Sequence, residues 1–346
     1  MKFTRRTGLL VAASAALALT LSACGATSGQ APADSSTAAD AAFPVTIEHI
    51  YGSTEITKKP ERVATVSWVN ADAVLALGVV PVGMAEDTWG NNEQGSTDWK
   101  DAKLAELGAS IGTEKAPKQY SEADSVNFTA IAELEPDVIM AGYSGLTQDE
   151  YDKLSKIAPV VGPLAANYTA GWQDVTTAVG KALGMDDEAA KVVADVEGKI
   201  TAAAEANPVF KDTTFIAGDL NVADSVISLY ATGDSRPRFL TALGMTQAPI
   251  VDENAKEGEF FMTWAAERAN ELDSDIFFTS ATAGVDAIKA NKLFAQIPAI
   301  SKGGLVAVTS DMETLAISAA SPLSVPYALD KVVPTFAAGA EASTGK

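Results

Sequence analysis

Residues able to do nucleophilic or metal chemistry are scarce in this chain of 346 residues. It has one cysteine, Cys24, and one histidine, His49, which lies in a strand-like N-terminal segment. A zinc or manganese site needs clustered histidine and carboxylate ligands, so an isolated histidine argues against one. No GxSxG, P-loop or GxGxxG motif brings a nucleophile, a base and an orienting residue together. The sequence therefore predicts a chain that is not an enzyme and has neither a metal ion nor a cofactor of its own.

Cys24 follows an N-terminal segment typical of exported proteins. A basic region precedes an apolar run over residues 9–23, which has the length of a signal-peptide core and is short for a membrane-spanning helix. The sequence LSAC, ending at Cys24, resembles a bacterial lipobox, in which the cysteine is acylated and becomes the first residue of the mature protein. We therefore expect a signal peptide over residues 1–23 and a lipid anchor, such as palmitate, on Cys24. A buried core thiol is the alternative, and Arg5-Arg6 leaves twin-arginine export open.

Residues 24–42 are nearly all small or polar, so we expect a disordered tether there. The anchor would then hold the folded body at the outer face of the cell membrane. Residues 1–23 carry three positive charges and no negative ones, so their removal changes the formal net charge from −20 to −23. Nucleic-acid binding depends on cationic side chains, so this acidic body is a poor candidate for it.

Short apolar runs alternate with amphipathic helical segments along the rest of the chain. This alternation predicts α/β layers with mostly parallel strands. Helices are expected over residues 70–78, 147–159 and 285–300. Strands are expected over residues 62–68, 79–85, 137–142, 213–220, 275–281 and 304–310.

Residues 172–206 differ, because they carry almost no strand signal and are rich in alanine, a strong helix former. We expect two helices with a break at residues 184–186, the second capped by Asp186 or Asp187 and ended by Asn207-Pro208. We interpret this segment as a spine between an N-terminal lobe over residues 43–171 and a C-terminal lobe over residues 207–340. A long crossover helix within one sheet is the alternative.

A weak internal repeat favours two lobes. Residues 128–142 align with residues 265–280 when the first residue of the second segment is dropped, which pairs Asp137 with Asp275. In each half a helix leads into an apolar strand that begins at the aspartate. Residues 76–83 and 242–249 also correspond, since each is a helix stopped by glycine and followed by a short strand. Two similar halves would leave a cleft between them, where small ligands are usually held.

The order of these segments resembles the iron–siderophore-binding lipoproteins of ABC importers, which share a fold with cobalamin binders. The resemblance implies two Rossmann-like lobes on a long helical spine, as in class III periplasmic binding proteins, and a monomer that delivers a ferric siderophore to a membrane permease. It covers nearly all of the mature body. Besides the lipobox and the tether, it rests on "FPVTIEHIYGSTEITKKPERVATVSW" (43–68), "ALGVVPVG" (76–83), "ELEPDVIMAG" (133–142), "YDKLSKIAPVV" (151–161) and "GDSRPRFLTALGM" (233–245).

A ferric siderophore is a bulky chelate whose iron is already coordinated, so the resemblance implies aromatic faces and hydrogen-bond donors in the protein rather than metal ligands. The carboxyl ends of parallel strands open onto the ligand crevice, which favours Trp68 and Tyr143. Core packing is the alternative for each aromatic residue. The ligand-binding candidates are Trp68, Trp89, Tyr143, Arg236, Arg238 and Trp264.

The two arginines flank Pro237, which suits the first turn of a helix. A guanidinium at a helix start opposes the helix dipole, so we expect Arg236 and, second, Arg238 to be directed at a ligand. The family pattern carries a basic residue here. An ion pair with Asp234 is the alternative.

These importers usually dock on the permease through one surface glutamate per lobe. By the repeat alignment, Glu267 fits the second site, whereas the equivalent first position is Thr129. Glu133, one helical turn later, is the substitute that we expect; a solvated acidic face is its alternative.

The class of ligand follows from charge. A triply anionic ferric catecholate would need several cations to offset it, and the candidates include two arginines in a strongly negative protein. We therefore predict a neutral or cationic hydroxamate-type chelate. Haem, with a tyrosine such as Tyr143 as axial ligand, and cobalamin are the alternatives. A purely structural surface protein would leave the repeat and the aromatic residues without a use.

Overall fold

The first sheet is built from the apolar runs of the N-terminal half. In a computed structural model, which describes residues 43–256, 258–281 and 284–344, five parallel strands have the order β5-β4-β3-β6-β7. Numbered along the chain this is 3-2-1-4-5, so the strand order reverses between β3 and β6, and such a reversal marks the ligand crevice of doubly wound sheets. The strands are β3 (Val63–Thr65), β4 (Gly83–Ala85), β5 (Lys118–Tyr120), β6 (Val138–Met140) and β7 (Val160–Val161).

The predicted signal peptide, Cys24 and the tether lie outside the described residues. In the part that is described, no helix has the length and apolar character needed to cross a membrane.

Helices connect the strands of the first sheet, and an antiparallel hairpin precedes it. The helices expected at residues 70–78 and 147–159 are confirmed as α2 (Asn70–Ala76) and α5 (Gln148–Leu154). The latter begins with a capping box, in which Thr147 and Glu150 satisfy each other's backbone N–H groups. The remaining elements are β1 (Val45–His49), β2 (Gly52–Ile56), α3 (Asp98–Glu106) and α4 (Phe128–Glu133).

The second sheet is mixed, which differs from the expectation of mostly parallel strands. Its order is β11-β9-β8-β12-β13. The strands β8, β12 and β13 are parallel, β9 pairs antiparallel with both β8 and β11, and the short β10 pairs parallel with β8. The strands are β8 (Thr214–Asn221), β9 (Val226–Tyr230), β10 (Thr246–Gln247), β11 (Phe261–Trp264), β12 (Ile276–Ser280) and β13 (Leu305–Val308).

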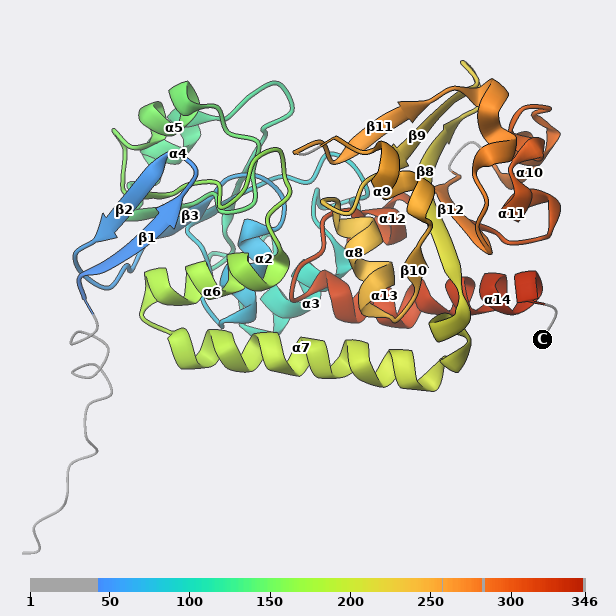
Figure 1. Ribbon diagram of the computed structural model, residues 1–346. Helices are drawn as coiled ribbons and strands as arrows, with labels where there is room; N and C mark the ends of the chain where they lie inside the picture. The colour runs from blue at the N-terminus through green and yellow to red at the C-terminus, as the bar shows by residue number, and fades with distance from the viewer. Residues whose placement is uncertain (1–42, 257, 282–283, 345–346) are drawn as a thin grey trace, which may run out of the picture. The chain divides into compact units, whose positions relative to one another are not determined.

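The helical segment between the sheets is confirmed. It consists of α6 (Trp172–Leu183) and α7 (Asp186–Ala206), which pack side by side (Figure 1), and Gly184 ends α6 in the left-handed conformation at φ 64°. The predicted cap is wrong: Met185 occupies the N-cap position, and Asp186 is the first helical residue, where a carboxylate complements the helix dipole. The interpretation of this segment as a spine between two lobes stays a prediction, as do the lobe boundaries.

The C-terminal half carries many short helices. The helix expected over residues 285–300 is broken into three, because Asn291 caps one piece and Pro298 begins another. The helices, with η marking 3₁₀ segments, are η1 (Pro208–Asp212), α8 (Ser235–Ala242), α9 (Pro249–Asn254), η2 (Ala266–Glu271), α10 (Val285–Ala290), η3 (Phe294–Gln296), α11 (Pro298–Ser301), α12 (Asp311–Ser318), α13 (Ser324–Lys331) and α14 (Val333–Thr344).

The internal repeat has a structural counterpart in two aspartates. Asp137 precedes β6, and its carboxylate accepts hydrogen bonds from the backbone N–H groups of Glu61 and Arg62, just before β3. Asp275 precedes β12, and its carboxylate accepts from the backbone N–H of Thr214, where β8 begins. Since β6 pairs with β3 and β12 pairs with β8, each aspartate holds the start of the neighbouring strand in register.

Candidate functional site

Two of the predicted aromatic residues meet where the strand order of the first sheet reverses. Trp68 follows β3 and Tyr143 follows β6, and Asn70 joins the two connections. The buried Asn70 side chain donates to the carbonyl oxygens of Val66 (2.6 Å) and Tyr143 (2.9 Å) and accepts from the backbone N–H of Tyr143 (3.0 Å). This amide satisfies backbone groups that would otherwise be buried without partners, so it fixes both connections.

A pocket of about 280 Å³ opens at this edge of the sheet. The indole of Trp68 and the phenol ring of Tyr168 both line it; their ring centroids are 5.8 Å apart at 19°, and the residues are 39% and 40% exposed. The Tyr168 ring also contacts the Tyr143 ring, with centroids 5.6 Å apart. Apart from Glu150, which lies in α5, the lining residues are in the connections that follow the carboxyl ends of the five strands β3 to β7. They are Val66, Ser67, Trp68, Thr88, Glu122, Ala123, Ser125, Val126, Ser144, Gly145, Leu146, Glu150 and Tyr168.

Tyr143 is the inner member of this aromatic row and is only 3% exposed. Its hydroxyl donates to the carbonyl oxygen of Ser318, 3.4 Å away, so it reaches a residue 175 positions later in the chain. Burial raises the pKa of Tyr143 to about 12, although the Ser235 hydroxyl and the charge of Arg236 act in the opposite direction. The phenol is therefore neutral near pH 7 and acts as a hydrogen-bond donor.

Arg236 is held by its own helix start. Its guanidinium makes two hydrogen bonds to the carboxylate of Asp234 (2.7 and 2.6 Å), and its central carbon lies 3.3 Å from the ring centroid of Tyr230. Burial lowers the pKa of Arg236, but the bonds to Asp234 outweigh it and keep the pKa above its ordinary value. This ion pair is the alternative that the sequence left open, and a ligand contact through Arg236 stays a prediction.

Arg238 ties two connections together. Its guanidinium donates to the carbonyl oxygens of Thr169, at 2.7 Å, Asp234, at 3.3 Å, and Gly233. Burial lowers the pKa of Arg238, and Tyr143, Asp234 and Asp174 offset this only in part. These N–H groups of Arg238 already have partners within the protein, so a contact between Arg238 and a ligand also stays a prediction.

Trp264 does not join the aromatic row. It ends β11, is 5% exposed, and its indole N–H donates to the carbonyl oxygen of Arg268 at 3.1 Å. The Arg268 guanidinium lies 4.5 Å from its ring centroid. Trp264 lines a different pocket, of about 740 Å³, together with Asn167 and Phe261. It packs among the buried apolar residues of the second sheet, which fits the core-packing alternative.

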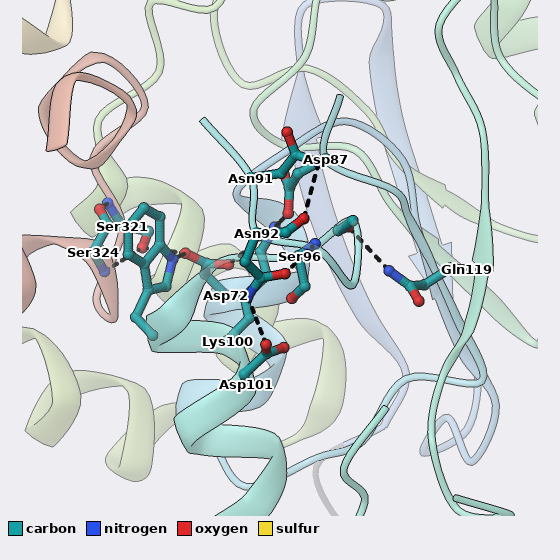
Figure 2. Close-up of polar contacts among 12 residues, drawn as sticks. Asp72, Asp87, Asn91, Asn92, Ser96, Lys100, Asp101, Gln119, Ser321 and Ser324 are labelled. Atoms are coloured by element: carbon teal, nitrogen blue, oxygen red, sulfur yellow. Dashed lines mark hydrogen bonds and ion pairs between the residues drawn. The ribbon is translucent and has the colours of Figure 1, made fainter. Parts of the chain in front are cut away.

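Trp89 lies in the connection between β4 and α3, is 41% exposed and lines neither pocket. Polar contacts hold this connection in place. The Asn92 side chain donates to Asp101 at 2.7 Å, and the Gln119 amide donates to the carbonyl oxygens of Gln94 and Gly95 (Figure 2). Whether Trp89 contacts a ligand stays a prediction.

A buried ionic network lies beneath this connection (Figure 2). The Lys100 ammonium is 2.7 Å from Asp87 and 3.7 Å from Asp72. Asp72 also accepts from the Trp99 indole N–H at 2.8 Å and from the Ser321 hydroxyl at 2.5 Å. Burial raises the pKa of Asp72 to about 6, while Lys100 lowers it. Through Asp72 the network connects α2 to the segment between α12 and α13.

The two predicted docking residues are both exposed. Glu133 ends α4 and lines a shallow groove with Phe128, Thr129 and Lys153, whereas Glu267 lies in η2. Their docking roles stay predictions. His49 hydrogen-bonds with Thr54 at 3.0 Å. In the described ranges no group of histidine, cysteine and carboxylate side chains is arranged to hold a metal ion.

Sequence reasoning missed Tyr168 and Glu122, which both line the pocket. Glu122 follows β5, a three-residue strand with the sequence KQY that has no apolar run to reveal it. Tyr168 follows the two-residue β7 and adopts a positive φ of 61°. The signal available in the sequence was the position of both residues after a parallel strand. Hydrophobic periodicity could not identify these strands, because β5 is not an apolar run and β7 has only two residues.

An α/β protein with a pocket at the switch point of a parallel sheet has the form of a small-molecule binding protein. The periplasmic binding protein family model matches residues 63–312, so the chain belongs to this family, one of binding proteins rather than enzymes. The family resemblance expected from the sequence is confirmed.

Individual relatives cover most of the chain. The Fe(3+)-citrate-binding protein YfmC of Bacillus subtilis is 28% identical over 261 residues, which is 73% of this chain and 74% of YfmC. The probable siderophore-binding lipoprotein YfiY of the same organism is 26% identical over 243 residues, 67% of each chain. The crystal structure of Streptococcus pneumoniae TIGR4 PiaA in complex with ferrichrome superposes with a TM-score of 0.79 at 31% identity, covering 86% of this chain and 99% of PiaA. The predicted class III periplasmic-binding-protein fold is thereby confirmed.

Proposed function

We propose that this protein is the substrate-binding component of an ABC importer that captures a ferric siderophore and delivers it to a membrane permease. The observation that carries the proposal is the row of Trp68, Tyr168 and Tyr143 at the switch point of the first sheet. Exposed aromatic faces suit the organic shell of a chelate, because they bury apolar surface without competing for the iron. The names of YfmC, YfiY and PiaA support iron-complex binding as the class of activity.

We further propose that the chelate is of the hydroxamate type. The guanidinium of Arg236 is paired with Asp234, and that of Arg238 donates to carbonyl oxygens. Asp234 neutralises Arg236, and the single charge of Arg238 is too small to balance a triply anionic catecholate, whose unpaired buried charge would be costly. The relative crystallised with ferrichrome supports the same class.

Delivery and anchoring complete the proposal. Glu133 and Glu267 are the proposed contacts with the permease, and acylated Cys24 is the proposed anchor at the extracytoplasmic face of the cell membrane. The lipoprotein name of the relative YfiY supports this location.

Haem is a weaker alternative than a siderophore. A tyrosine binds haem iron as the phenolate, and burial raises the pKa of Tyr143 to about 12, which disfavours that form. A cobalamin-binding protein of the same fold is the other alternative.

A thermal-shift panel of ferric hydroxamates, ferric catecholates, haem and cobalamin tests the proposal. A ligand that binds only the folded chain raises the melting temperature by mass action. We expect the largest rise with a ferric hydroxamate. A rise with haem or cobalamin alone would overturn the proposed ligand class.

A further inference from the structure

The pocket at the switch point contains acidic groups with no cation to balance them. Glu122 lines it, and one of its carboxylate oxygens, Oε2, accepts from the backbone N–H of Ser67 at 2.9 Å. Its other oxygen, Oε1, is buried and accepts no hydrogen bond from the residues that the structure describes. A buried carboxylate oxygen without a partner costs free energy that a cationic ligand can recover.

A second carboxylate lines the same pocket. The Glu150 carboxylate accepts from the backbone N–H and the hydroxyl of Thr147, both at 2.8 Å, which fixes it at the start of α5. Burial raises the pKa of Glu122 to about 7; the bond from Ser67 lowers it, and the charge of Glu150 raises it further. The other titratable groups beside Glu122 are the phenols of Tyr120 and Tyr168. The lining residues, all of them described, include no lysine or arginine.

The aromatic rings of the pocket complement these charges. Trp68 and Tyr168 present indole and phenol faces, and an ammonium over such a face is attracted by the ring quadrupole. Partial burial strengthens the attraction between a cation and the carboxylates, because the effective dielectric constant is lower than in water. An anionic group would meet two carboxylates here and no compensating cation.

We propose that the pocket lined by Trp68, Glu122, Glu150 and Tyr168 binds an ammonium group carried by the ferric chelate. The proposal rests on the proposed function and narrows it, since it assigns the cationic arm of the ligand to this edge of the first sheet. The ammonium lies against the aromatic faces, within the field of both carboxylates. The remainder of the chelate extends toward the exposed part of the Trp68 indole.

A matched pair of chelates tests this subsite. Ferrioxamine B carries a terminal ammonium, and its N-acetylated form has the same iron centre without the charge. We expect the full-length protein to bind the charged form at least about tenfold more tightly in calorimetric titrations, which is the magnitude of a partly desolvated ion contact. Glu122→Gln reduces this preference to less than about twofold, and an unchanged circular dichroism spectrum with a cooperative thermal transition shows that the variant is folded.

Asp124→Asn is the matched control. Asp124 is exposed, lies two residues from Glu122, and does not line the pocket. This variant loses the same unit of charge from the same region, and we expect it to keep the full preference. If both variants reduce the preference equally, the general negative field of the protein is responsible and the subsite is overturned.

The pH dependence provides a second readout. Because the pKa of Glu122 is raised to about 7, the carboxyl gives up a proton when the cation binds. The affinity for the charged form therefore rises between pH 6 and pH 8, while that for the acetylated form stays level. Equal affinities for the two forms, or parallel pH profiles, overturn the subsite and leave the importer function standing. If neither form binds but another ferric chelate does, the subsite is likewise overturned; if no ferric chelate binds, both proposals fail.

Discussion

At the scale of single residues, the account depends on how aromatic side chains are divided between site and core. Trp68 follows the strand β3, and Trp264 ends the strand β11. Trp68 is nevertheless exposed beside Tyr168, whereas Trp264 is buried. The difference follows from position: Trp68 lies in the connection after β3, whereas Trp264 is the last residue of β11 itself and packs into the apolar cluster of the second sheet. Residue type alone does not separate the two cases.

Replacing Trp68 tests its role. We expect Trp68→Leu to raise the Kd for a ferric hydroxamate about tenfold to a hundredfold, because the indole face that covers the chelate is lost. The melting temperature of the free protein changes little, since Trp68 is exposed. Trp89→Leu is the control, matched in exposure but outside the pocket, and we expect a smaller effect. Titration calorimetry gives both values, and an unchanged Kd for Trp68→Leu would contradict the assignment.

The sequence predicted part of this site for a physical reason. Strand ends of a parallel sheet gather at one edge, so Trp68 and Tyr143 were predictable from their position after apolar runs. Glu122 follows β5, whose sequence KQY is not an apolar run, and Tyr168 follows β7, which has only two residues. The sequence left two partners open for Arg236, namely Asp234 and a ligand. An arginine serves either purpose, so the residue type could not decide between them.

At the scale of elements, buried strands were predicted better than edge strands. The strands β3, β6, β8 and β12 have continuous apolar runs, as expected for strands covered on both faces. β9 alternates buried and more exposed residues over only five positions, and β11 has one buried residue in four, so neither stands out from a loop. For this reason the antiparallel half of the second sheet was not predicted.

The contact between α2 and the segment after α12 gives a pH-dependent prediction. Burial raises the pKa of Asp72 to about 6 from its ordinary value of 3.8. The protonated carboxyl therefore stabilises the fold, fully below pH 3.8, and this contribution is lost as the pH rises through about 6. Asp72→Asn has no carboxyl to ionise and therefore no such loss. Its free energy of unfolding, measured relative to that of the natural chain, should increase by up to about 3 kcal/mol between pH 4 and pH 7.

Urea denaturation of both chains at several pH values measures this difference. Titrating groups outside this network cancel in the comparison, because they are shared by the two chains. The opposite result, in which the natural chain gains free energy of unfolding relative to Asp72→Asn as the pH rises, would contradict this prediction. It would mean that the ion pair with Lys100 outweighs the burial of Asp72.

At the scale of the whole molecule, the order of motifs predicted the family and the α/β fold, but not how distant segments pack. The Ser321 hydroxyl reaches Asp72 across 249 positions of the chain, and the rings of Tyr327 and Trp99 are 5.1 Å apart. Short-range patterns carry no information about such contacts. The paired aspartates Asp137 and Asp275 are the exception, since the repeat alignment already placed them at equivalent strand starts.

Anchoring is also a property of the whole molecule. We expect the full chain to fractionate with membranes when produced in a bacterial host, and Cys24→Ala to release it, because acylation requires the thiol. Ser28→Ala, in the predicted tether, is the control and should stay with the membranes. Release of both variants, or of neither, would contradict a lipid anchor on Cys24. Ligand binding should be the same in all three chains.

The central claim is that the protein binds a preformed ferric chelate through aromatic contacts and does not coordinate the iron. The absorption spectrum of a ferric hydroxamate during titration with the full-length protein tests it most directly. We predict that tryptophan fluorescence is quenched while the hydroxamate-to-iron charge-transfer band keeps its position, because no protein atom enters the coordination sphere. A new phenolate-to-iron band on binding would contradict this account.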